Sequence, residues 1–267
     1  MSTMKVLVIG GSTGIGEGIA ASSLALGADV VIASHTAEKL AAVKEKFGSA
    51  VVTELVDVAD EEQVKALFER VGEVDHVVFC AEAVMRGHFR KVTTSTERQN
   101  FEVKFWGAYY TAFHMRIKAG GSFTLFSGSI SRMPWSGMTN VSMINSALET
   151  MARGLAFELA PIRVNCISPG TIDTPAWLHI SKADREALFA KTRAELPVRR
   201  VGETRDAVDA AMMVMQNGFI TGSVIDVDGG ALLVGYSADT PPLTLVAATP
   251  PLTQPTATEP AATPLAV

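Results

Sequence analysis

The sequence is poor in cysteine, with only Cys80 and Cys166 among its 267 residues. Both lie inside apolar runs, which favours two reduced thiols in a hydrophobic core over a disulfide or a metal site. No apolar stretch approaches the roughly 18 residues that a membrane-spanning helix needs, so we expect no membrane partner. These shortages argue against a disulfide-rich secreted module and against an integral membrane protein.

Positive charge is also scarce, because 23 Lys and Arg residues stand against 28 Asp and Glu residues, for a formal net charge of −5. Such a chain has no general attraction for phosphate backbones, so nucleic acid is not an expected partner. The first expected strand begins near Met4, and no basic segment followed by an apolar one precedes it. We therefore expect no signal peptide and a cytoplasmic protein.

The remaining composition, 48% hydrophobic and 19% charged, is that of a globular chain with one large core. Short β-branched runs alternate with longer helical patterns, which predicts repeated βαβ units and a parallel sheet. The expected strands are Lys5–Ile9, Asp29–Ala33, Val51–Leu55, His76–Phe79, Ser122–Phe126, Arg163–Ile167 and Ser223–Val227. The expected helices are Gly14–Gly27, Thr36–Phe47, Glu61–Val71, Thr94–Ala119, Ser142–Leu159, Lys182–Glu195 and Glu203–Gln216. Together they predict an α/β fold with one doubly wound, seven-stranded parallel sheet, a Rossmann fold, in a single domain.

The expected domain spans residues 1–236, and a change of composition marks its end. Residues 237–267 are rich in Pro, Thr and Ala and carry almost no charge. Such a segment offers little for a packed core and is typical of an extended or disordered tail. Its apolar residues could instead lie along a groove or a partner subunit.

A glycine-rich loop follows the first expected strand and opens the first expected helix, with the sequence Gly10-Gly11-Ser12-Thr13-Gly14-Ile15-Gly16. Glycine is needed there because a side chain would block the turn and the approach of a diphosphate. The start of the helix then offers free N–H groups and a partial positive charge to phosphates. The alternative, a flexible turn, is weakened by the strand–loop–helix context, which predicts a nicotinamide dinucleotide site.

The spacing Gly-x-x-x-Gly-x-Gly resembles that of the short-chain dehydrogenase/reductase superfamily. Asp57-Val58 after the third strand, the run from Pro161 to Thr174, and Val227-Asp228-Gly229-Gly230 are similar to further motifs of that superfamily, over roughly residues 4 to 235. The resemblance implies that Asp57 lies against the adenine ring and that Ile172 and Thr174 contact the nicotinamide side. The expected cofactor-binding residues are Gly10, Ser12, Thr13, Gly14, Ile15, Gly16, Ser34, His35, Asp57, Val58, Ala81, Pro169, Gly170, Ile172 and Thr174.

The choice between the two dinucleotides depends on the end of the second strand. An acidic residue there would bond the ribose diol and repel a 2'-phosphate. The chain has Ser34-His35-Thr36 instead, with Lys39 one helical turn further on. Several donors and no carboxylate favour NADP(H), while a polar loop with an incidental histidine would leave NAD(H) open.

The residues that usually catalyse the superfamily's reaction are missing. The resemblance places its Tyr at Val141, its Lys at Asn145, its Ser at Gly128 and its helix Asn at Lys104. None of these four positions keeps the usual residue. A positioned general acid is worth roughly 10² to 10⁴ in rate, so a substitute proton source is expected for a carbonyl substrate, whereas an iminium carbon needs none in that step.

The candidate catalytic residues are therefore Lys104, Ser129 and Asn145. Lys104 is the first candidate for a proton donor or an electrostatic clamp, and its alternative is a solvated helix lysine. Ser129 and Asn145, together with Arg132, could equally be structural. Trp135 could line the substrate pocket or pack in the core.

This set of replacements is similar to an atypical branch of the superfamily that lacks the Tyr and Lys and includes bacterial oxidoreductases and fungal reductase/Diels–Alderase enzymes. The resemblance implies an NADPH-dependent reductase of an apolar carbonyl, enone or iminium. A non-redox cyclase or isomerase that keeps NADP bound, and an inactive dinucleotide-binding regulator, remain alternatives. The resemblance also implies that residues 176–200 cover a small-molecule substrate. It further implies that a homodimer or homotetramer forms through the helices at 94–119 and 142–159.

Overall fold

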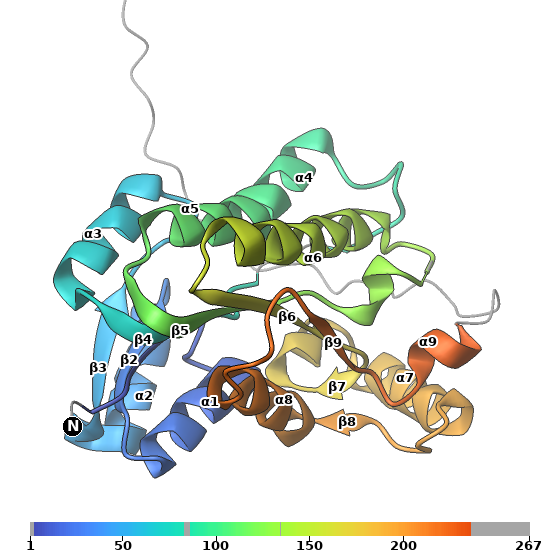
Figure 1. Ribbon diagram of the computed structural model, residues 1–267. Helices are drawn as coiled ribbons and strands as arrows, with labels where there is room; N and C mark the ends of the chain where they lie inside the picture. Colours follow the sequence, from blue (N-terminus) through green and yellow to red (C-terminus); the bar gives the residue numbers. More distant parts are fainter. Residues whose placement is uncertain (1–2, 83–85, 134, 236–267) are drawn as a thin grey trace, which may run out of the picture.

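A parallel sheet of seven strands forms the centre of the computed structural model, which describes residues 3–82, 86–133 and 135–235 (Figure 1). These strands are β1 (Lys5–Ile9), β2 (Asp29–Ser34), β3 (Val51–Leu55), β4 (Val74–Phe79), β5 (Ile117–Phe126), β6 (Arg163–Pro169) and β9 (Val224–Val227). Their order is β3-β2-β1-β4-β5-β6-β9, and every neighbouring pair is parallel. The predicted doubly wound sheet is confirmed. Its order reverses between β1 and β4, where ligands bind in open α/β sheets. The expected tail, 237–267, lies outside the described residues.

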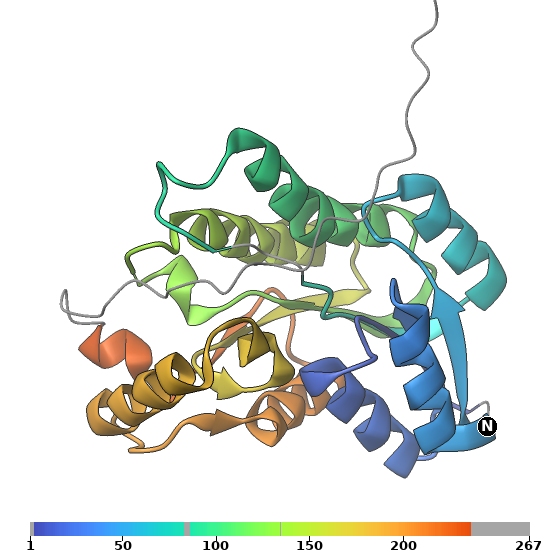
Figure 2. The ribbon, with the colours of Figure 1, turned by 180° about the vertical axis from the view of Figure 1, so that it is seen from behind.

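Helices cover both faces of this sheet, as the views from front and back show (Figures 1 and 2). The α-helices are α1 (Gly14–Ala25), α2 (Ala37–Phe47), α3 (Glu61–Val71), α4 (Thr94–Phe101), α5 (Gly107–His114), α6 (Thr139–Glu158), α7 (Lys182–Glu195), α8 (Thr204–Gln216) and α9 (Ala231–Val234). Helices α3, α5 and α6 pack on one face, and α1, α2 and α8 pack on the other. The short 3₁₀ segments are η1 (Gly48–Ala50), η3 (Ser129–Ser131) and η4 (Pro175–His179), and η2 (Glu102–Trp106) is a π-helix. Because both faces are covered, Val6, Leu7, Val8 and Ile9 of β1 are all fully buried.

The expected helix Thr94–Ala119 is wrong at its C-terminal end. The helical segment ends at His114, and β5 begins at Ile117. Ile117 pairs with Val74 while Ser122 pairs with His76, so extra residues bulge out of β5 between these two pairs. Two glycines make the bulge possible: Gly120 has φ +81°, and a Cβ at Gly121 would lie 2.1 Å from the Asp75 carbonyl oxygen. The other predicted elements are confirmed, with ends that differ by a few residues.

A small second sheet, which the sequence did not predict, lies beside the main one. It pairs β7 (Ile172–Asp173) with β8 (Gly202–Glu203), and this pairing brings the two ends of the segment 176–200 together. Trp177 and Phe189 from that segment pack in one buried cluster with Trp135 and Val141. The segment expected to cover the substrate therefore packs against α6 and the loop that precedes it.

None of the helices within the described part of the chain is long and apolar enough to cross a membrane.

Candidate active site

The glycine-rich loop turns sharply at the C-terminal end of β1. Gly10 has φ +81°, and a Cβ there would lie 2.6 Å from the amide nitrogen of Ala81, so only glycine lets this loop approach the end of β4. Gly14 has φ +57°, and a Cβ there would meet only Pro175 and Thr174, at 3.6 Å or more. The loop is therefore tight on its protein side and open on the side where α1 begins.

A cavity of about 650 Å³ lies over this loop. Its walls come from the ends of β1, β2, β3, β4, β5 and β6, as expected at the point where the strand order reverses. Thirteen of the fifteen expected cofactor-binding residues line it: Gly10, Ser12, Thr13, Gly14, Ile15, Gly16, Ser34, His35, Asp57, Val58, Ala81, Pro169 and Thr174.

The start of α1 fits a diphosphate. Thr13 is the N-cap residue, and its side chain makes no capping hydrogen bond to the first turn. The first-turn amides of this 12-residue helix therefore face the cavity without a capping side chain, which is the arrangement that binds phosphate at helix N-termini. The residues present fit a dinucleotide.

The far end of the cavity, after β2, carries donors. Ser34 is buried and shares a hydrogen bond of 3.0 Å with Ser12. His35 and Lys39 are exposed and line the same end. Asp57 also lines this cavity and accepts a hydrogen bond from the amide of Ala59 at 3.0 Å. A polar group beyond the ribose would meet two basic side chains there.

A second cavity, of about 140 Å³, adjoins the first, because Ile15, Glu82, Ser127, Pro169, Thr174 and Ala176 line both. It holds the two remaining expected cofactor residues, Gly170 and Ile172. The three candidate catalytic residues, Lys104, Ser129 and Asn145, also line it. The structure therefore brings the two predicted sets together in adjoining spaces.

Lys104 is 3% exposed and lies in the π-helix η2. Its Nζ donates to Oε2 of Glu82 at 3.3 Å, and Oε1 of the same carboxylate accepts a hydrogen bond from Arg86 at 3.1 Å. The alternative of a solvated helix lysine is wrong, because the side chain is enclosed and paired. π-Helical turns often mark functional positions, since they displace a side chain from the regular helix face.

Asn145 is 2% exposed, and its amide oxygen has no hydrogen-bond partner within the described residues. A Cβ at Gly128 would lie 3.0 Å from its Nδ2, so this glycine gives the Asn145 amide room beside the loop after β5. Lys104 and Asn145 both line the second cavity.

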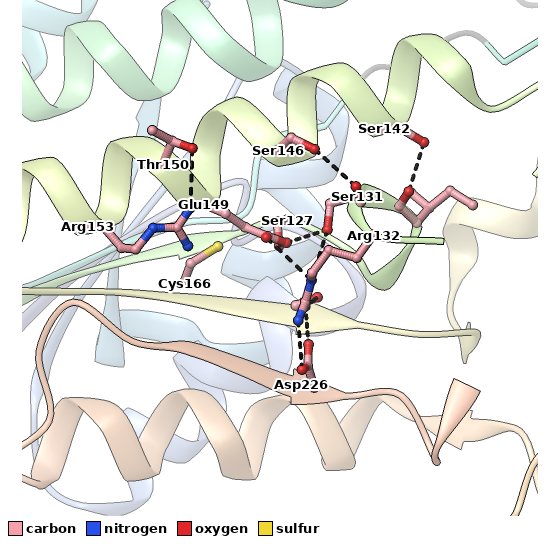
Figure 3. A network of polar contacts seen from close by, with 12 residues as sticks. Ser127, Ser131, Arg132, Ser142, Ser146, Glu149, Thr150, Arg153, Cys166 and Asp226 are labelled. Carbon is pink, nitrogen blue, oxygen red and sulfur yellow. Dashed lines mark hydrogen bonds and ion pairs between the residues drawn. The ribbon is translucent and has the colours of Figure 1, made fainter. Parts of the chain in front are cut away.

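A buried carboxylate supports the loop after β5 from behind (Figure 3). Glu149 of α6 is 4% exposed, and its Oε1 accepts hydrogen bonds from the hydroxyls of Ser127 and Ser131. Its Oε2 lies 3.5 Å from Nε of Arg132, whose guanidinium donates to Asp226 and Ser168. The ion pair with Asp226 raises the pKa of Arg132, so this cation is permanent. Arg132 thus joins the loop to β6 and β9.

Sequence reasoning missed Glu82 and Glu149 as residues of this region. Ser127 and Ser129 flank Gly128, where the resemblance expects the Ser; only Ser129 is among the candidate catalytic residues, but Ser127 lines both cavities. The signal for Glu149 was present, because it follows Asn145 by four residues and so shares a helix face with it. Nothing in the sequence indicates Glu82, which pairs with Lys104 only through the fold.

The two thiols are unbonded. Cys166 is fully buried, and burial raises its pKa to about 11. Cys80 is half-buried, packs against the core cluster that contains β1 and β2, and also lines the first cavity, and desolvation raises its thiol pKa too. Both groups are therefore protonated at neutral pH and are poor nucleophiles. Cys166 lies in the core as expected, and Cys80 lies at the edge of the core because β4 ends at Phe79.

The parallel sheet, the glycine loop and the cavity at the switch point define a Rossmann-type α/β protein. The family model described as enoyl-(acyl carrier protein) reductase matches residues 10–231. An uncharacterised oxidoreductase of Mycobacterium tuberculosis is 31% identical over 90% of this chain and 96% of its own length. The chain therefore belongs to the short-chain dehydrogenase/reductase family of oxidoreductases.

Solved structures of similar proteins have the same fold. A small-chain dehydrogenase in complex with NADPH is 34% identical, with a TM-score of 0.72 over 87% of this chain and 100% of its own. The MalC reductase/Diels–Alderase from Malbranchea aurantiaca is 27% identical, with a TM-score of 0.80 over 86% of this chain and 97% of its own.

Proposed function

We propose that this protein is an NADPH-dependent reductase of an apolar carbonyl, enone or iminium compound that works without the Ser–Tyr–Lys set. The observation that carries the proposal is the buried pair Lys104 and Asn145 in the wall of a cavity that adjoins the dinucleotide cavity. The NADPH complex of a 34% identical neighbour and the basic His35 and Lys39 support NADP(H) as the cofactor.

A bound reduced nicotinamide supplies a hydride to the carbon of the substrate. The residues of the chain supply the rest. The Lys104 ammonium holds a proton at Nζ, next to the cavity, and can pass it to the oxygen of a carbonyl substrate, which leaves a neutral amine on Lys104. Glu82 is more exposed and is paired with the same Nζ, so it offers a route for a proton from water to restore the ammonium.

Asn145 and Ser129 have supporting roles in this proposal. The buried carboxamide of Asn145 makes the cavity wall near Lys104 polar, and Ser129 is a buried residue of the same wall. With an iminium substrate the hydride converts the cation into a neutral amine, no proton is needed in that step, and Lys104 is not required as an acid.

The direct test is consumption of NADPH, followed at 340 nm, with a panel of ketones, enones and cyclic imines. We expect turnover with at least one class, and a lower Kd for NADPH than for NADH in a fluorescence titration. The variant Ser34→Asp should reverse that preference, because a carboxylate at the end of β2 repels a 2'-phosphate and bonds a free ribose diol.

The same panel separates the alternatives. Product formed equally with NADP in either oxidation state would replace the proposal with non-redox catalysis. NADPH binding without any turnover would indicate a regulator. Preference for NADH in the wild-type protein would overturn the cofactor assignment.

A further inference from the structure

The second cavity is divided between residues that it shares with the larger cavity and residues of its own. The shared residues come from the glycine loop, the segments after β4 and β5, the end of β6 and the start of η4, and they include Ile15, Pro169 and Thr174. The residues that line only the second cavity come from η2, from η3 and the loops on either side of it, from α6, from residues 170–172 and from η4. Gly170 and Ile172 among them are expected cofactor-binding residues, and the part lined by η2, α6, η4 and the loop after η3 is left for a substrate.

Its apolar wall is rigid. Trp135, Met138, Val141 and Trp177 are each at most 9% exposed and pack together in one cluster. The Trp177 indole is fixed on three sides, because its Nε1 donates to the carbonyl of Ile172 at 2.7 Å, its ring meets Phe189 edge-on, and the Arg86 guanidinium lies over it. Such a wall sets a size limit, because packed cores do not deform freely.

Val141 decides how much room there is. It is 4% exposed, it lies one helical turn before Asn145 on α6, and it occupies the position where the family resemblance expects tyrosine. A valine in place of a tyrosine leaves out a whole ring. Trp177, Lys104 and Asn145 line the same cavity as Val141.

The volume fixes the scale of the ligand. A protein cavity of about 150 Å³ with apolar walls holds one benzene molecule. The second cavity, at about 140 Å³, is of similar size and therefore matches one six-membered ring. Among the polar side chains of its lining, which are Lys104, Asn145, Ser129, Glu82, Ser127, Thr171 and Thr174, the lysine ammonium is the cation that attracts an oxygen.

We propose that this subsite takes a compound with a single aryl ring and a carbonyl oxygen, that the ring lies against Val141 and Trp177, and that the oxygen points to Lys104. The inference rests on the proposed reductase function, because it places the reacting carbonyl at the proposed proton donor. Val141 is the residue that sets the ring-size limit.

Binding is tested with benzamide, an unreactive aryl carbonyl compound, and with 2-naphthamide as the two-ring probe, by ligand-detected NMR on protein saturated with NADPH. We expect benzamide to bind and 2-naphthamide to bind at least tenfold more weakly. Val141→Phe refills the space and should weaken the binding of benzamide at least tenfold. Val141→Ala should reduce the difference in affinity between benzamide and 2-naphthamide.

Met143→Phe is the matched control, because Met143 lies on the same helix but is 42% exposed. It should leave benzamide binding unchanged, and the NADPH Kd of every variant should stay within about twofold of wild type. Equal benzamide binding by wild type and Val141→Phe, or no binding to the NADPH complex, would overturn the subsite. Benzamide binding without reduction of acetophenone would instead count against the reductase function and leave the subsite standing.

Discussion

At the scale of single residues, the charge of Lys104 is the least expected feature of the site. Lysine is almost never fully buried unless it is paired, because an ammonium loses its hydration inside a protein. Here Glu82 lies 3.3 Å from Nζ and offsets part of that loss, while the π-helical turn places the side chain in the cavity wall. A buried cation kept beside a cofactor cavity is better explained by chemistry than by stability.

Replacing Lys104 tests this directly. Lys104→Gln should lower kcat by about 10²- to 10⁴-fold on a carbonyl substrate, because it removes the proton donor. Lys104→Arg keeps the charge but holds its proton too tightly to give it up, so it should be nearly as slow. The NADPH Kd, measured by fluorescence, should change little in either variant. Wild-type kcat in both variants would exclude Lys104 as the donor.

A second buried base, His76, makes the fold sensitive to acid. His76 of β4 is 9% exposed, and its Nδ1 lies 2.8 Å from the Ser122 hydroxyl. Burial, helped by the nearby Arg163 cation, lowers the pKa of His76 from 6.5 to about 4. Between pH 6.5 and pH 4 the unfolded chain therefore binds a proton that the folded protein does not bind. Stability is complete above pH 6.5 and falls as the pH drops through this window.

We expect His76 to account for a loss of about 2 to 3 kcal/mol in the free energy of unfolding between pH 7 and pH 4.5. Urea denaturation of wild type and His76→Gln at both pH values isolates this contribution, because glutamine can still bond Ser122 but does not titrate. Between pH 7 and pH 4.5 the variant should lose about 2 to 3 kcal/mol less of its free energy of unfolding than wild type loses. The same pH dependence in both proteins would show that His76 is not the sensor.

At the scale of secondary-structure elements, helix α6 holds the loop after β5 through residues spaced along one face. Ser142 donates to the carbonyl of Ile130 at 2.8 Å, and Ser146 donates to that of Ser131 at 3.1 Å. Glu149 continues the row and accepts from the hydroxyls of Ser127 and Ser131 (Figure 3). Residues three and four apart share a helix face, so one straight helix sets the position of a loop that lines the second cavity.

Glu149→Gln should therefore cost about 1 to 3 kcal/mol of unfolding free energy, because an amide N–H would then face the Arg132 guanidinium without an acceptor. Glu158→Gln, at the exposed end of the same helix, should change it by less than about 0.5 kcal/mol. Urea denaturation at pH 7 measures both. Equal stability of the two variants would mean that the buried carboxylate does not support the loop.

At the scale of the whole molecule, the outer surface of α5 and α6 is unusually apolar. Phe113 of α5 is 71% exposed, Tyr109 is 45% exposed, and Phe157 of α6 is 88% exposed. Exposed aromatic groups of this kind are typical of protein–protein contacts. They lie on the two helices through which the family resemblance implies assembly.

The expected homodimer or homotetramer should be visible by light scattering of the purified protein at micromolar concentration. Phe113→Asp combined with Phe157→Asp should shift the mass towards the monomer, because two carboxylates would then be buried in the contact. Val52→Asp, at a 55% exposed position on the edge strand β3, is the control and should not change the mass. A monomeric wild-type protein would refute the assembly.

Much of the fold could be predicted because its signals are local. The β-branched runs and the glycine loop are read within a few residues, so the seven strands and the cofactor cavity followed from them. The C-terminal end of the expected helix at 94–119 could not be predicted in this way. Strand β5 begins before the expected end of that helix because its chain bulges against β4 at Gly120 and Gly121. The strands β7 and β8 are two residues long and depend on each other across 30 residues of chain.

The sequence by itself determined the sheet and the loop that turns at Gly10, and it carries Val141 and Asn145 where the family resemblance expects Tyr and Lys. Periodicity and backbone freedom are properties of neighbouring residues, so no tertiary contact is needed to read them. Only the tertiary structure decided that Lys104 is buried against Glu82 and that Glu149 supports the loop after β5. Burial and ion pairing depend on residues far apart in the chain, and they become defined when the sheet and its helices pack together.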